Sequence, residues 1–110
     1  MIKNINMKKL LIFLPILLIA FISCKKTSDK TAPVIILNGA SSLTTGKGYP
    51  FNDPGATASD DTDGDITSKI IVDNPVDTGA LGIYYVTYNV TDNAGNAAIE
   101  VKRKVEVRFN

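Results

Sequence analysis

The sequence predicts an all-β fold, an antiparallel β-sandwich of about seven strands, and three observations indicate it. Apolar and polar residues alternate through the C-terminal part of the chain, which is the period of half-buried strands. Glycine, proline, asparagine and aspartate recur every few residues, as turns between short strands require. Beyond the N-terminal apolar run, no segment has the 3.6-residue period of an amphipathic helix. With 110 residues, the chain has room for one such domain at most.

Residues 1–23 are predicted to be a cleaved signal helix. Residues 1–9 hold three lysines and no acidic residue, and residues 10–22 are an apolar run interrupted only by Pro15. A basic head before an apolar segment of about 7–15 residues is typical of an export signal, whereas a membrane span needs roughly 20 apolar residues. A start at Met7 would leave Met-Lys-Lys before the same run, so the sequence leaves the start open between Met1 and Met7.

Residues 20–24 read Ala-Phe-Ile-Ser-Cys and resemble the lipobox of bacterial lipoproteins. In a lipobox an aliphatic residue and then a small one precede the acylated cysteine. The resemblance implies cleavage before Cys24 and attachment of fatty acids such as palmitate to it, although Phe21 stands where leucine is usual. Ordinary cleavage with an incidental cysteine is the alternative. Cys24 is the only cysteine of the chain, so the exported domain cannot form a disulfide within itself.

Residues 24–32 are predicted to be the lipidated cysteine and a flexible tether, because residues 25–32 are polar and lack an apolar period. Fully stretched at about 3.3 Å per residue, the tether spans roughly 25 Å. The domain, residues 33–110, would therefore lie close to the lipid bilayer. Lys25 follows the cysteine where aspartate would favour retention in the inner membrane. We expect an envelope protein outside the cytoplasm, anchored to the outer membrane.

Net charge excludes nucleic acid as a partner. The chain has 12 basic and 11 acidic residues, and removing the three lysines of the signal leaves 9 against 11, a net charge of −2. A protein that binds nucleic acid needs a basic face. Residues 53–92 instead hold eight aspartates and one lysine.

Three short β-rich runs are expected in the first half of the domain, at residues 34–37, 56–59 and 66–72. Turn-forming residues separate them. Pro50 and Pro54 cannot lie in a central strand, because proline lacks the N–H that the ladder needs.

Residues 82–91 form the clearest strand, with Tyr84, Val86, Tyr88 and Val90 on the face toward the core. Tyr84 comes two residues after Gly82 at the start of this strand, so its hydroxyl could bond a nearby backbone group as a tyrosine corner does. Residues 92–96 are suited to the tight turn of a hairpin.

Residues 99–109 continue the alternation. The predicted inward row is Ile99, Val101, Val105, Val107 and Phe109, with charged residues between them. Arg103 interrupts this row, which indicates either a β-bulge or a strand that runs past the edge of the core.

Four blocks of the sequence, residues 31–39, 53–58, 63–67 and 88–96, look like parts of the bacterial Ig-like domain first described as repeats in certain pesticidal crystal proteins. The resemblance covers residues 29–109. It implies an immunoglobulin-like sandwich of a kind found in many surface and secreted bacterial proteins, mostly as repeats or appended modules without a defined activity. A single copy behind a lipid anchor departs from that arrangement.

Residues 60–65 place four carboxylates in six positions, and like charges this close repel unless water or a cation neutralises them. Calcium takes six to eight oxygen ligands. Because the spacing is not that of an EF-hand, a site would need a second loop, and in an Ig-like sandwich the loop between the last two strands lies at the same end, as does the tether. The candidate calcium ligands are Asp60, Asp61, Asp63, Asp65, Asp92, Asn93 and Asn96. The other interpretation is that these residues form turns.

Catalysis is not expected. The chain has no histidine and no cysteine besides Cys24, which removes Ser-His-Asp and Cys-His arrangements and histidine-bound zinc. No cofactor is predicted other than the calcium above. The sequence favours a membrane-anchored envelope lipoprotein with a non-catalytic module for protein or glycan contact or for envelope structure. The alternative is a calcium-dependent adhesion module. Tyr85 and Tyr49 are the candidates for exposed contact, for instance by stacking on sugar.

Overall fold

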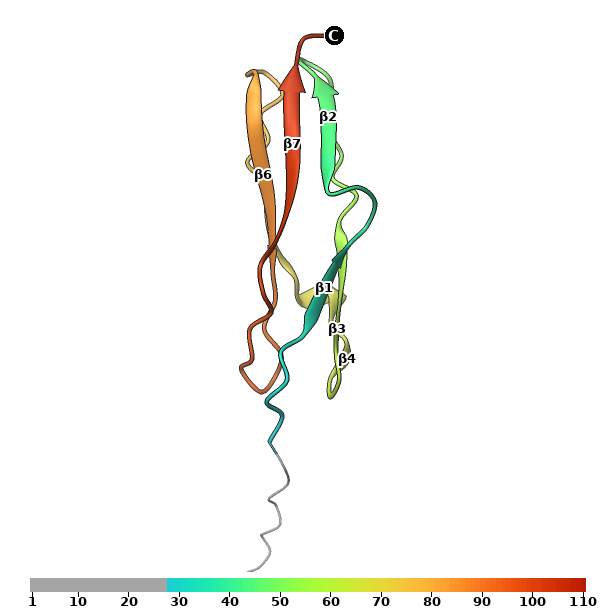
Figure 1. Ribbon diagram of the computed structural model, residues 1–110, viewed down its shortest axis with the longest axis vertical. Helices are drawn as coiled ribbons and strands as arrows, with labels where there is room; N and C mark the ends of the chain where they lie inside the picture. The colour runs from blue at the N-terminus through green and yellow to red at the C-terminus, as the bar shows by residue number, and fades with distance from the viewer. Residues whose placement is uncertain (1–27) are drawn as a thin grey trace, which may run out of the picture.

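The computed structural model describes residues 28–110, so the predicted signal peptide and Cys24 lie outside the described residues. Residues 28–110 form seven strands in two sheets that pack as a sandwich (Figure 1). The first sheet has the order β1-β3-β4, with β1 (Val34–Leu37), β3 (Ala56–Asp60) and β4 (Gly64–Asp65). The second sheet has the order β2-β7-β6-β5, with β2 (Ser42–Gly46), β7 (Val101–Arg108), β6 (Gly82–Asn89) and β5 (Ile71–Asp73). The predicted all-β sandwich is confirmed.

The described residues contain one short 3-10 helix, η4 (Thr67–Lys69), between β4 and β5. No helix in residues 28–110 has the length and apolar character that crossing a bilayer requires. The predicted strand over residues 66–72 is wrong in its first half, because η4 occupies that part and β5 begins only at Ile71. Asp65 Oδ1 accepts the N–H of Thr67 at 2.9 Å, and this local bond turns the chain instead of extending it. The side-chain and backbone hydrogen bonds from Thr67 also lower the pKa of Asp65.

The first two strands of the chain, β1 and β2, belong to different sheets. β1 pairs antiparallel with β3, whereas β2 pairs parallel with β7. The chain crosses from one sheet to the other through residues 38–41, where Gly39 has φ +76°, a backbone conformation that glycine adopts without strain. β2 is missing from the sequence-based prediction, because Ser-Leu-Thr-Thr-Gly has one large apolar residue and resembles a loop.

β6 and β7 form the long central hairpin of the fold. Tyr84 pairs with Val105 and Val86 pairs with Arg103 in an unbroken antiparallel register. The prediction that Val86 and Tyr88 face the core is confirmed, since both are fully buried. The hydroxyl of Tyr84 donates to the carbonyl oxygen of Ala80 at 2.8 Å, which confirms the expected bond to a nearby backbone group.

The ends of the predicted inward row of β7 lie outside the core. Ile99 and Phe109 are 87% and 73% exposed. Both residues lie outside β7 (Val101–Arg108), and their predicted burial in the core is wrong, although Ile99 faces a small apolar pocket beside β1. The core consists of buried small and branched side chains with one tyrosine. Its members are Ile35, Ala56, Ala58, Ile66, Val86, Tyr88, Val90, Ala98 and Val105.

Arg103 lies inside the sandwich rather than at a bulge or beyond the edge of the core, and both sequence-based alternatives are wrong. Its side chain is fully buried. The guanidinium donates two hydrogen bonds to the carbonyl oxygen of Asn38 and one each to those of Ala40 and Gly55, at 2.7–3.0 Å. Arg103 Nε lies 3.1 Å from Asp53 Oδ1, an ion pair whose angle does not make a hydrogen bond. Arg103 thus ties β7 to the crossing segment and to the residues before β3.

Candidate functional site

One end of the sandwich gathers the loops that carry the acidic residues. The β3–β4 turn, the β6–β7 loop and the chain entering from the tether all lie at the end opposite the C-terminus (Figure 1). The backbone N–H of Asn93 donates to Asp63 Oδ2 at 2.8 Å. Asn96 Nδ2 donates to the carbonyl oxygen of Asp29 at 3.0 Å. The predicted convergence of two loops and the tether at one end is therefore present.

Three carboxylates meet at this end, and we call Asp29, Asp60 and Asp92 the carboxylate cluster. One oxygen of each residue lies within 4.8 Å of the corresponding oxygens of the other two. Asp60 and Asp92 are 7% and 5% exposed, and Asp29 is half-buried. Each residue comes from a different segment: the tether, the end of β3 and the β6–β7 loop. Buried like charges repel in the absence of a compensating charge, so this arrangement stores electrostatic strain.

The hydrogen bonds of Asp60 and Asp29 use only one oxygen of each carboxylate. Asp60 Oδ2 accepts the N–H groups of Thr62 and Asp63 at 3.0 and 2.9 Å, whereas Asp60 Oδ1 is buried with no hydrogen-bond partner. Asp29 Oδ1 accepts the N–H of Thr31 at 3.0 Å, and Asp29 Oδ2 is likewise buried without a partner among residues 28–110. The hydrogen bonds from nearby backbone N–H groups therefore satisfy only one of the two oxygens of each carboxylate.

Asp92 is held on both oxygens by Asn96, whose backbone N–H and side-chain Nδ2 donate at 2.8 and 2.9 Å. Burial raises the pKa of Asp92, but hydrogen bonds, chiefly those from the side chain and backbone of Asn96, outweigh it and lower that pKa to about 2. The opposite balance holds at Asp29. The N–H of Thr31 lowers its pKa, while burial and the neighbouring carboxylates of Asp92 and Asp60 raise it by more. The repulsion within the carboxylate cluster thus raises the pKa of Asp29, the cluster residue that belongs to the tether.

The structure brings only two of the seven predicted calcium ligands, Asp60 and Asp92, into the cluster. The remaining five are Asp61, Asp63, Asp65, Asn93 and Asn96. Asp61 is exposed, Asp65 bonds to Thr67, and Asp63 accepts from the backbone of Asn93. The side chain of Asn93 accepts from Lys69.

Sequence reasoning missed Asp29, which was assigned to the flexible tether. Two features of the sequence could have identified it. Asp29 lies five residues before the β-rich run expected at residues 34–37, and the tether is expected at the same end as the acidic loop. A carboxylate at the last part of the tether would then reach that loop.

The outer face of the four-stranded sheet exposes an aromatic residue. Tyr85 is 49% exposed, and its neighbour on the same face of β6, Ile83, is 54% exposed. Lys102 Nζ lies 5.8 Å from the centroid of the Tyr85 ring, within the range of a cation–π contact. The second predicted contact residue, Tyr49, is also exposed, but it lies in the loop after β2.

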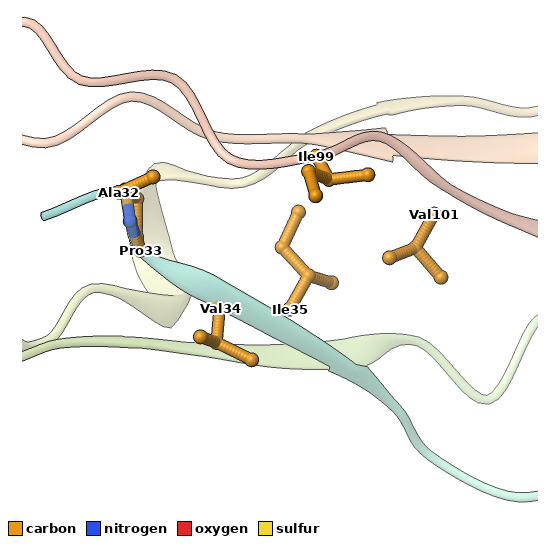
Figure 2. Close-up of a pocket in the computed structure, with 6 residues that line it drawn as sticks. All are labelled: Ala32, Pro33, Val34, Ile35, Ile99 and Val101. Atoms are coloured by element: carbon orange, nitrogen blue, oxygen red, sulfur yellow. The ribbon is translucent and has the colours of Figure 1, made fainter.

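A small apolar pocket opens beside β1, between this strand and the segment that leads into β7 (Figure 2). Its volume is about 250 Å³, and its lining is Ala32, Pro33, Val34, Ile35, Ile99 and Val101. Pockets that enclose small molecules usually measure about 300–1,000 Å³ and carry a few convergent polar groups. No polar side chain lines this pocket.

Two packed β-sheets, a sheet-crossing N-terminal strand and a tyrosine corner define an immunoglobulin-like module. Residues 35–107 match the family model described as "Bacterial surface protein, Ig-like domain". The chain belongs to this family. A 41-residue stretch, 36% of the chain, is 54% identical to the pesticidal crystal protein Cry22Aa of Bacillus thuringiensis, of which it spans 6%.

Two solved structures with a similar fold belong to a lipoprotein and to a protein that contains a CBM51 module. The lipoprotein BT2262 of Bacteroides thetaiotaomicron superimposes with a TM-score of 0.62 at 29% identity, over 71% of this chain and 38% of that chain. A structure of CBM51-2 in complex with GlcNAc and INT domains from Clostridium perfringens ZmpB superimposes with a TM-score of 0.56 at 31% identity, over 71% of this chain and 17% of that chain. The chain therefore spans less than two-fifths of either structure.

Proposed function

We propose that this chain is a non-catalytic contact module of the bacterial cell envelope, anchored by lipid at Cys24. We further propose that it binds glycan or protein through the outer face of its four-stranded sheet. The observation that carries the proposal is the exposed side chain of Tyr85, flanked by Ile83 and Lys102 on a regular sheet surface. A tyrosine supplies apolar contact area and a polar tip at once, which suits it to recognition surfaces.

The register of the sheet places these side chains together. Tyr85 lies opposite Lys104, and Ile83 lies opposite Glu106, so an aromatic and an aliphatic side chain are surrounded by charged ones. The apolar face of a sugar ring can stack on such a tyrosine while neighbouring charged groups bond its hydroxyls. The similarity to a structure that contains a carbohydrate-binding module supports glycan as the first class of ligand to test.

The lipobox-like sequence and the eight residues that separate Cys24 from Pro33 support anchoring by this cysteine. The similarity to a lipoprotein of the same fold supports it. The proposed location is the outer membrane, with the acidic end of the sandwich nearest to the lipid, because the tether enters at that end (Figure 1). The sheet face with Tyr85 then lies on the side of the module and not at the end where the tether enters.

Glycan binding is tested on an array that includes GlcNAc-terminated oligosaccharides, with the full chain purified in detergent. The Tyr85→Ala variant should lose at least tenfold in affinity for any glycan that the wild type retains. Ile36→Ala is the matched control, since Ile36 is 62% exposed on the other sheet, and it should bind as the wild type does. Equal binding by wild type and Tyr85→Ala would refute the proposed surface.

Anchoring is tested separately with Cys24→Ser. The wild type should pellet with membranes and carry a mass above that of the polypeptide from Cys24 onward by the mass of its acyl groups. The Cys24→Ser variant should carry no acyl groups. A wild-type mass equal to that of the bare polypeptide would contradict the lipid anchor without bearing on the sheet surface.

A second function, calcium-dependent adhesion, is favoured by the carboxylate cluster. In this case the ion would not contact the ligand directly. It would set the orientation of the module on its tether, and the binding of partners would then depend on calcium.

A further inference from the structure

We propose that Asp29, Asp60 and Asp92 bind one divalent cation, with calcium as the best fit, and that this ion fastens the base of the tether to the sandwich. The ligand set differs from the acidic turn that the sequence alone indicates, because it includes a tether residue and leaves out Asp61. The proposal depends on neither the lipid anchor nor the contact surface.

The geometry of the cluster suits one ion. Oxygen ligands lie 2.3–2.6 Å from calcium, so two ligands on opposite sides of the ion are about 5 Å apart. The three carboxylate oxygens lie within 4.8 Å of one another, which places all of them within reach of a common centre. Further oxygen ligands, including water, can complete the shell.

The second observation is the unpartnered oxygen of Asp60. This residue is 7% exposed, and its Oδ1 atom is buried without a hydrogen bond. Burying an ionised carboxylate oxygen without a partner is costly. Asp29 Oδ2 is in the same condition. Two of the three converging carboxylates thus each retain an oxygen that a cation would satisfy.

No basic side chain of residues 28–110 forms an ion pair with the cluster. Within residues 28–110 the only ion pair joins Arg103 to Asp53, and neither of these residues belongs to the cluster. Lys69, which lies near the same end, donates instead to the side chain of Asn93. Three carboxylates therefore face one another with no protein cation among the described residues to balance them.

The chemistry of the donors selects the kind of ion. All three are hard carboxylate oxygens, and residues 28–110 contain neither histidine nor cysteine, which disfavours zinc. Magnesium requires near-ideal octahedral geometry and keeps most of its water, whereas calcium tolerates irregular sets of carboxylates. A site at the edge of an extracellular module commonly binds calcium with a Kd of about 10⁻⁴–10⁻³ M.

Binding at this site would change the tether. Asp29 precedes the first strand by five residues, and it already accepts a hydrogen bond from Asn96 through its carbonyl oxygen. An ion shared with Asp60 and Asp92 would hold the Asp29 side chain as well. The last residues of the tether would then become part of the folded domain, and the module would lose freedom to swing relative to its anchor.

The test is differential scanning calorimetry of the full chain in detergent, in calcium chloride and in chelator at matched ionic strength. A tenfold excess of calcium over Kd should raise the melting temperature by about 5–10 °C. Asp29→Asn should abolish this rise. In chelator its melting temperature should equal or exceed that of the wild type, because one repelling charge is gone and the core is untouched.

Asp61→Asn is the matched control, since it removes a carboxylate from the same acidic turn outside the cluster, and it should keep the full calcium response. Isothermal titration with calcium chloride should give one site in the wild type and none in Asp29→Asn. The absence of both heat and melting shift in the wild type would overturn the proposal. A calcium response that survives in Asp29→Asn but disappears in Asp61→Asn would overturn it as well. Glycan binding is measured independently, so either proposal can fail alone.

Discussion

Replacing Arg103 by methionine removes the buried cation that joins β7 to the segment crossing between the sheets. The guanidinium donates four hydrogen bonds to three backbone carbonyls and pairs with Asp53. Methionine fills a similar volume but satisfies none of these groups. The variant therefore leaves the mostly buried carboxylate of Asp53 without its counter-charge, and leaves the carbonyls of Asn38, Ala40 and Gly55 without their donor.

The expected loss is about 3–5 kcal/mol of unfolding free energy, the usual cost of removing one partner of a buried ion pair. Each buried carbonyl left without a donor costs about 1–3 kcal/mol. The total loss of unfolding free energy stays near the upper end of the ion-pair range and does not exceed it. Asn38 and Ala40 are exposed, so water replaces part of the hydrogen bonding that their carbonyls lose. For a small domain whose whole stability is about 5–15 kcal/mol, this loss is large.

Urea unfolding followed by far-ultraviolet circular dichroism measures the change, and the slope with denaturant should stay constant. Lys102→Met is the matched control on the same strand: Lys102 is exposed, so the change should be within about 0.5 kcal/mol. Arg103→Lys should lie between the two, because lysine keeps the charge but not the planar fork. If Arg103→Met lost less than about 1 kcal/mol, the buried network would not be what joins the two sheets.

Two further predictions concern tyrosines of β6. Burial, together with the hydrogen bond to Asp53, raises the pKa of Tyr88. The phenolate absorbance of Tyr88 at 295 nm is obtained as the difference between the wild type and Tyr88→Phe. In the folded chain this absorbance should appear at higher pH than in the unfolded chain. Because the folded pKa is raised, the stability that Tyr88 contributes should be fully present below about pH 10 and lost as the pH rises further; an unshifted titration would contradict this. Tyr84→Phe removes the bond to Ala80 and should cost about 1 kcal/mol in urea unfolding, whereas Tyr85→Phe, on the outer face, should cost almost nothing.

The strands with the clearest alternation could be predicted from the sequence. Val86, Tyr88 and Val90 are buried as their spacing indicates, because a strand with one face on the core must place every second residue inward. The meeting of the acidic turn with the β6–β7 loop could also be anticipated, since it follows from the topology of the sandwich.

Arg103 could not be placed from the sequence, because a charged residue in an inward row conflicts with the general rule that arginine stays at the surface. Its partners are carbonyl groups of residues 38, 40 and 55 and the carboxylate of Asp53, which only the folded chain brings together. Asp29 was missed for a related reason. Its neighbours have the composition of a flexible tether, and only contact with Asp60 and Asp92 gives it a place in a site.

The most direct test of a surface contact module held by lipid at Cys24 is trypsin treatment of intact cells. The predicted tether contains lysines at positions 25, 26 and 30, so cleavage there should release residues 31–110 into the medium from wild-type cells while proteins inside the envelope stay whole. A chain that stays full-length on intact cells, yet is cleaved after the cells are broken open, would contradict surface display.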